Sequence, residues 1–95
     1  MGKPIRTLLV DDEEGFRETV TERLTMRGHQ VTAVPSAETA LSAVKEQEFD
    51  VAVVDILMPG MDGITLLEHL RNLFPFLEVI ILTGQGSIES AVDAM

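Results

Sequence analysis

The chain has 95 residues, and seven Lys and Arg against sixteen Asp and Glu give a formal net charge of −9. This length allows one small domain with a modest core. The negative charge argues against direct contact with nucleic acid or an anionic membrane, since both need basic residues to meet phosphates. The absence of Cys excludes disulfides and thiolate chemistry and agrees with a cytoplasmic location. No apolar span typical of a membrane helix or signal peptide occurs.

The first half of the chain predicts a strand, a helix and a second strand. An apolar, β-branched run over residues 5–10 indicates the first strand. Residues 14–27 have helical spacing, and Gly28 is the expected stop. A short strand follows over 31–34, typical of a sheet edge, and Pro35 ends it. The helical spacing comes from apolar residues at every fourth position: Phe16, Val20 and Leu24.

The second half repeats this alternation. Ser36 is the expected N-cap of the next helix, and the apolar run 51–55 predicts a strand buried on both faces. A third helix closes at Pro75, a strand follows over 78–82, and Ser87 caps a last helix. The expected core stripes of the three helices are Ala37, Ala40, Leu41 and Val44; Ile64, Leu67, Leu70 and Phe74, with Leu66 and Leu73 beside them; and Ile88, Ala91, Val92 and Met95. Four strand–helix units in this order predict a parallel sheet with right-handed crossovers and helices on both faces.

Polar residues follow three of these strands. Asp11 and Asp12 follow the first, Asp55 ends the third, and Thr83 follows the fourth. In parallel α/β sheets, ligands bind at the carboxyl ends of the strands, so we expect these side chains to meet there. Carboxylates about 5 Å apart repel by roughly 3 kcal/mol per pair at an effective dielectric of about 20. A hard divalent cation such as Mg²⁺ offsets that repulsion, and together with a hydroxyl it makes a phosphate-handling site.

Each of these residues also has a purely structural interpretation. The acidic run from Asp11 to Glu14 favours the positive end of the first helix. Asp55 alone could cap a turn, and Thr83 alone could mark the end of a strand. The joint occurrence at three strand ends is what favours the functional interpretation.

With these residues in these positions, the sequence resembles the receiver domain of bacterial two-component response regulators. The matching segments are residues 8–13, with the acidic pair Asp11 and Asp12; residues 53–63, with the pattern D-x-x-M-P-x-M-D-G from Asp55; and residues 81–84. Residues 83–92 further resemble receivers of the nitrogen-regulation type, which control transcription activators that hydrolyse ATP.

The resemblance implies a flavodoxin-like, doubly wound α/β fold with strand order 2-1-3-4. It implies that Asp55 takes a phosphoryl group from a phosphohistidine on a sensor histidine kinase. It further implies that Asp12, Asp55 and the backbone carbonyl of Leu57 ligate Mg²⁺, that Asp11 acts largely through water, and that Thr83 binds a phosphoryl oxygen. The expected role is therefore a phosphoacceptor with slow autodephosphorylation, not a turnover enzyme. It is expected to switch a transcriptional output, through an output domain or a downstream effector.

The family also has a fifth strand, which carries a lysine and a switch aromatic, and a fifth helix. Neither Lys3 nor Lys45 matches that lysine, so residues 1–95 are expected to be a receiver domain cut within the fourth helix. Because an exposed strand edge favours pairing, we expect either that the natural chain continues beyond Met95 or that a homodimer forms through the fourth strand and last helix.

Three other functions stay open on the sequence. A non-phosphorylated receiver-like interaction module would fit the absence of the lysine. An aspartyl-phosphate hydrolase usually needs a second carboxylate two residues after the nucleophile, where this chain has Leu57. A flavin-binding flavodoxin needs a phosphate loop after the first strand, where the acidic run would repel phosphate.

Overall fold

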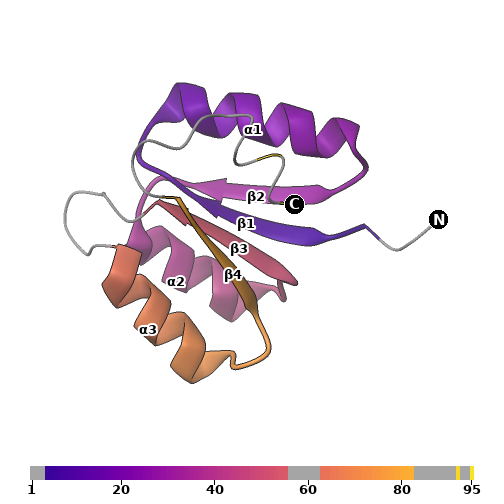
Figure 1. Cartoon of the computed structure of the whole chain (residues 1–95). Coiled ribbons are helices and arrows are strands. Elements are labelled where there is room, and N and C mark those ends of the chain that lie inside the picture. The colour runs from indigo at the N-terminus through magenta and orange to yellow at the C-terminus, as the bar shows by residue number, and fades with distance from the viewer. Residues whose placement is uncertain (1–3, 56–62, 83–91, 93–94) are drawn as a thin grey trace.

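The computed structural model of the protein describes residues 4–55, 63–82, 92 and 95. Within these residues, strands and helices alternate in the predicted order (Figure 1). Val92 and Met95 are the described residues of the predicted last helix, and the rest of that helix lies outside the described residues. The elements are β1 Arg6–Val10, α1 Glu14–Met26, β2 Gln30–Val34, α2 Ala37–Glu46, β3 Val51–Asp55, α3 Gly63–Leu73 and β4 Glu78–Leu82.

The four strands form one parallel sheet in the order β2-β1-β3-β4. Helix α1 covers one face of the sheet, and α2 and α3 cover the other (Figure 1). The doubly wound fold and its strand order are therefore as predicted. Among the described helices, none is long and apolar enough to cross a membrane. That a fifth strand and helix continue the domain beyond Met95 stays a prediction.

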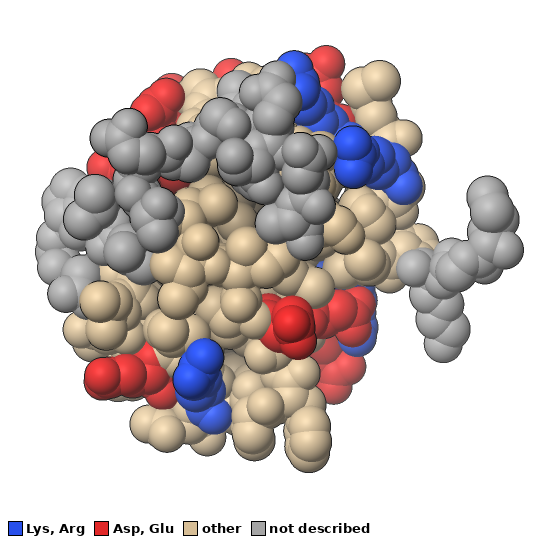
Figure 2. Space-filling view, in the orientation of Figure 1, with Lys and Arg blue, Asp and Glu red and all other residues tan. Residues whose placement is uncertain are grey.

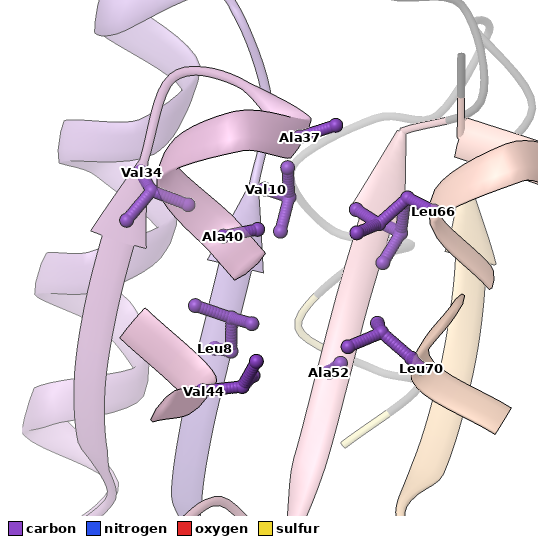
Figure 3. Packing of buried hydrophobic residues seen from close by; sticks show 10 residues of the cluster. Leu8, Val10, Val34, Ala37, Ala40, Val44, Ala52, Leu66 and Leu70 are labelled. Carbon is purple, nitrogen blue, oxygen red and sulfur yellow. The ribbon is translucent and has the colours of Figure 1, made fainter. Parts of the chain in front are cut away.

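The core has two layers because neighbouring residues of a strand point to opposite faces of the sheet. Leu8 and Val10 of β1 pack toward α2 and α3, in the cluster shown in Figure 3. Leu9 packs on the other face, toward α1, where Val92 joins the same cluster. Leu8, Leu9 and Val10 are all fully buried, as expected of a central strand covered on both sides.

The predicted boundaries at Gly28 and Ser36 are confirmed by their hydrogen bonds. At the end of α1, Gly28 has φ of 90°, and the N–H groups of Gly28 and His29 donate to the carbonyls of Thr25 and Leu24. This is the Schellman arrangement, in which glycine accepts the left-handed conformation without steric cost. At the start of α2, the Ser36 hydroxyl accepts the Thr39 N–H and the Thr39 hydroxyl accepts the Ser36 N–H, both at 3.1 Å. This reciprocal capping box fixes the first turn.

The predicted core stripe of α3 is wrong at its two ends. Leu66 and Leu70 are fully buried and Gly63 is buried, whereas Ile64 is 54% exposed and Phe74 is 37% exposed. Six apolar residues within eleven positions allow more than one helical stripe, and the pattern does not choose between them. Leu66 and Leu70 face Ala52 of β3 and the α2 side chains (Figure 3), so contact with the sheet decides which stripe is buried.

The orientation of α3 predicts that replacing Leu70 and replacing Leu73 by alanine will lower the free energy of unfolding by different amounts. Leu70→Ala removes a fully buried side chain and should lower the free energy of unfolding by about 2–5 kcal/mol. Leu73→Ala, where the side chain is 55% exposed, should cost well under half of that. Calorimetry measures both, because the chain has neither Trp nor Tyr. Equal costs would contradict the observed orientation of α3.

Candidate functional site

The carboxyl ends of β1 and β3 bring the predicted aspartates together. These strands are neighbours, and Val10 lies opposite Val54 in their register. Asp55 therefore ends β3 beside the point where β1 gives way to Asp11 and Asp12. One carboxylate oxygen from each of the three aspartates lies within 4.8 Å of the other two. This convergence follows from the register of the sheet, because the two strands stop at the same level.

The three aspartates differ in their access to solvent. Asp11 is 6% exposed and Asp55 is 8% exposed, whereas Asp12 is exposed. Asp11 and Asp55 are therefore largely removed from solvent, whereas Asp12 remains open to it. Buried charges of one sign need a compensating partner. The cluster offers only hard oxygen donors, which suit Mg²⁺ or Ca²⁺ and do not suit a metal that prefers nitrogen or sulfur.

Asp11 is held at three points. Its N–H donates to the carbonyl of Val34 at 3.2 Å, which extends the β1–β2 ladder by one residue. Its carboxylate accepts the N–H of Glu13 at 2.8 Å, and Glu13 is the N-cap residue of α1. Its main-chain carbonyl accepts a hydrogen bond from Nη1 of Arg17 at 2.8 Å. Asp11 thus has a structural role at the start of α1, where its carboxylate accepts the N–H of the N-cap residue, and it also contributes to the carboxylate cluster.

The electrostatics of the cluster appear in the pKa of Asp11. This pKa is raised from 3.8 to about 6: burial contributes most, the negative charges of Asp55 and Asp12 contribute in the same direction, and the hydrogen bond from the Glu13 N–H acts against them. Desolvation and like charge thus both disfavour the ionised carboxylate. A bound cation would reverse this balance by favouring the ionised form. The geometry and the charge therefore point to the same ligand class.

Of the predicted site residues, the structure joins Asp11, Asp12 and Asp55. Leu57 and Thr83 lie outside the described residues. The pairing of Asp55 with Leu82 in the β3–β4 register is the described contact nearest to Thr83 in the chain. Sequence reasoning missed Arg17, although a basic residue one turn into α1 lies within reach of the acidic run that precedes the helix.

A separate cleft of about 430 Å³ opens near the amino-terminal ends of β1 and β3, away from the aspartates. Phe49, Phe74 and Phe76 line it, with Arg6 paired to Asp50 at 3.0 Å on its rim. None of the clustered aspartates lines this cleft. Its lining is mainly apolar, and it has no share in the chemistry of the carboxylate cluster.

The raised pKa of Asp11 predicts a pH dependence of stability in the metal-free protein. Between about pH 3.8 and 6 the folded protein holds a proton that the unfolded chain releases, so stability falls as pH rises through this window. Asp11→Asn cannot ionise but can still accept the Glu13 N–H. Its stability relative to the parent should therefore rise from pH 4 to pH 7 when both are measured by calorimetry with EDTA. Parallel curves for parent and variant would contradict the raised pKa.

Comparison with known proteins identifies the family of the chain. The family model described as the response regulator receiver domain matches residues 7–95. The response regulator protein FleR of Pseudomonas aeruginosa is 40% identical over 90 residues, which cover 95% of this chain and 19% of FleR. The DNA-binding transcriptional regulator NtrC of Klebsiella pneumoniae is 37% identical over 86 residues, which cover 90% of this chain and 18% of NtrC. The chain thus spans about a fifth of the length of these two relatives.

A solved structure gives the same result. The response regulator protein TrrA of Thermotoga maritima, in complex with Mg²⁺ and beryllofluoride, superposes with a TM-score of 0.81 at 29% identity. The match covers 94% of this chain and 82% of that one. The family match, the sequence relatives and the shared fold all agree, and the chain belongs to the response regulator receiver domain family.

Proposed function

We propose that Asp55 is the phosphoacceptor of this receiver domain and that Mg²⁺ binds beside it. The observation that carries the proposal is the convergence of three carboxylates at the ends of β1 and β3. Asp12, Asp55 and the backbone carbonyl of Leu57 would ligate the ion, with Asp11 acting largely through water. When bound, Mg²⁺ would neutralise charge on the phosphoryl oxygens. TrrA, whose structure contains Mg²⁺ and beryllofluoride, supports this assignment by its similarity.

The proposed reaction is transfer from a phosphohistidine of a sensor histidine kinase. A carboxylate oxygen of Asp55 attacks phosphorus, the P–N bond to the imidazole breaks, and its electron pair stays on the histidine nitrogen. The product is an acyl phosphate on Asp55. Phosphoryl transfer mainly requires alignment and charge stabilisation. Asp55 meets the first requirement because the end of a buried strand fixes its backbone, and Thr83 is proposed to bind a phosphoryl oxygen.

The phosphorylated domain is proposed to act as a switch. The acyl phosphate adds charge at the end of β3, and movement of Thr83 would transmit that change toward the last helix. The output would be transcriptional, in keeping with the relative named as the DNA-binding transcriptional regulator NtrC. The net charge of −9 supports an output domain that contacts DNA separately from this one. The modified group belongs to the protein itself, so the domain is a phosphoacceptor with slow autodephosphorylation and not a turnover enzyme.

A second interaction is proposed on the β4 side. Among the described strands β4 lies at the edge of the sheet, and Ile81 is 40% exposed. Figure 2, drawn in the orientation of Figure 1, shows mostly uncharged surface in the region of β4. An apolar strand edge favours pairing with further chain. A homodimer through β4 and the last helix is therefore proposed, and light scattering would detect it.

The alternative function is a non-phosphorylated receiver-like interaction module. In that case the carboxylates would be a residual feature, and neither a phosphodonor nor Mg²⁺ would act on them. The convergence of three carboxylates, two of them buried, favours the phosphoacceptor, because a bound divalent cation would offset the repulsion among them.

Phosphorylation is tested with acetyl phosphate and Mg²⁺, followed by intact-mass measurement. The parent should gain one phosphoryl adduct, and Asp55→Asn should lose it. Asp50→Asn is the matched control, since Asp50 lies just before the opposite end of β3 and should keep the adduct. An adduct at full yield in Asp55→Asn would place the phosphoacceptor elsewhere, and no adduct in the parent would favour the interaction module.

Metal binding is tested separately by stability. A ligand that binds only the folded state adds about 2.7 kcal/mol at a hundredfold excess over its dissociation constant. Mg²⁺ should therefore stabilise the parent in calorimetry, and Asp12→Ala should abolish that response. The metal-free variant should be at least as stable as the parent, because a repelling charge is gone. Equal stabilisation of parent and variant by Mg²⁺ would show that the ion binds at another site.

A further inference from the structure

Arg17 makes a contact that the phosphoacceptor scheme does not use. It lies in the second turn of α1, with its own N–H bonded to the Glu13 carbonyl at 3.0 Å, and its side chain is half-buried. Instead of extending into solvent, the guanidinium returns toward the end of β1. There Nη1 donates to the main-chain carbonyl of Asp11 at 2.8 Å. A charged donor makes this bond stronger than one between neutral groups.

The carbonyl of Asp11 belongs to the peptide group that joins Asp11 to Asp12. A peptide group is planar, so fixing its oxygen also fixes the direction of the Asp12 N–H and of the chain that follows. The other two contacts of Asp11 act elsewhere, one on its N–H toward Val34 and one on its carboxylate from Glu13. The Arg17 bond acts on the carbonyl itself and so holds the plane of the peptide group that leads into Asp12.

Asp12 needs such support more than the other two aspartates. Asp55 is the last residue of β3 and Asp11 continues the β1–β2 ladder, whereas Asp12 follows the strand and is exposed. From this geometry we infer that Arg17 is a positioning residue, which orients the Asp11–Asp12 peptide so that the Asp12 carboxylate is preorganised to bind a divalent cation with Asp55. This inference rests on the proposed metal site and adds to it a residue that is not itself a ligand.

The positive charge of Arg17 allows its electrostatic effect on cation affinity to be distinguished from its effect on the orientation of Asp12. A positive side chain near a cation site repels the cation, so removing it should tighten binding if charge alone matters. If Arg17 orients the Asp12 peptide, removing it should instead weaken binding, because the carboxylate must be ordered on binding. Groups that orient metal ligands typically contribute about 10–100-fold in affinity. The two explanations thus predict opposite changes.

The test compares Arg17→Ala, Arg17→Lys and Arg27→Ala with the parent protein. Arg27 is exposed at the C-terminal end of α1, so Arg27→Ala makes the same charge change away from the cluster. Mg²⁺ affinity is measured by backbone NMR titration. Arg17→Ala should raise the dissociation constant about tenfold. Arg17→Lys, which keeps a donor and the charge, should recover part of the affinity, and Arg27→Ala should match the parent.

A second readout needs no metal. In EDTA, Arg17→Ala should shift the Asp12 amide signal and speed its hydrogen exchange, while Arg27→Ala leaves both unchanged. Mg²⁺ binding by Arg17→Ala that equals or exceeds that of the parent would overturn the inference, and so would an unchanged Asp12 amide. If the parent itself binds no Mg²⁺, the proposed metal site fails, and the metal-free Asp12 signal alone decides whether Arg17 orients this peptide. Should Arg17→Ala be unfolded in calorimetry, Arg17→Lys carries both measurements.

Discussion

Repulsion among three carboxylates at one end of the sheet is the constraint around which this domain is built. Asp11 and Asp55 are nearly buried, and their oxygens lie within 4.8 Å of each other and of Asp12. Burial of Asp11 and, to a smaller extent, the like charges beside it lower the stability of the metal-free protein at neutral pH, as the raised pKa of Asp11 indicates. A hydrophobic core on both sheet faces holds the strand ends together against this repulsion. Function is thus supported by core packing at some distance from the chemistry.

The start of α1 joins the core to the site. Leu24 and Val20 anchor the helix on the sheet, and its first turns reach back to Asp11 through the Glu13 N–H and the Arg17 guanidinium. The acidic loop is therefore tied both to β1 and to the helix that follows it. A site on rigid elements can hold its geometry before the ligand arrives, which reduces the ordering required on binding.

The sequence pattern predicted the strands and the aspartate cluster, and the resemblance to the receiver family implied the strand order. Short continuous apolar runs that alternate with helices along the chain indicate parallel strands. A parallel sheet brings the ends of these strands, and so Asp11, Asp12 and Asp55, to one edge. The prediction failed where the hydrophobic pattern was ambiguous, as in α3, where Leu66 is buried and Ile64 is not. The spacing of Arg17 places it within reach of the acidic run, but its contact is to a main-chain carbonyl, which residue type does not reveal. Side-chain direction over a loop depends on tertiary structure.

The most direct test of the central claim is to locate the cation itself. Crystals grown with Mn²⁺ in place of Mg²⁺ would give an anomalous difference peak at the ion. We expect one strong peak between the carboxylates of Asp12 and Asp55, at oxygen-ligand distance from both and bridged to Asp11 through water. A fully occupied peak elsewhere on the molecule, with none beside Asp55, would contradict it.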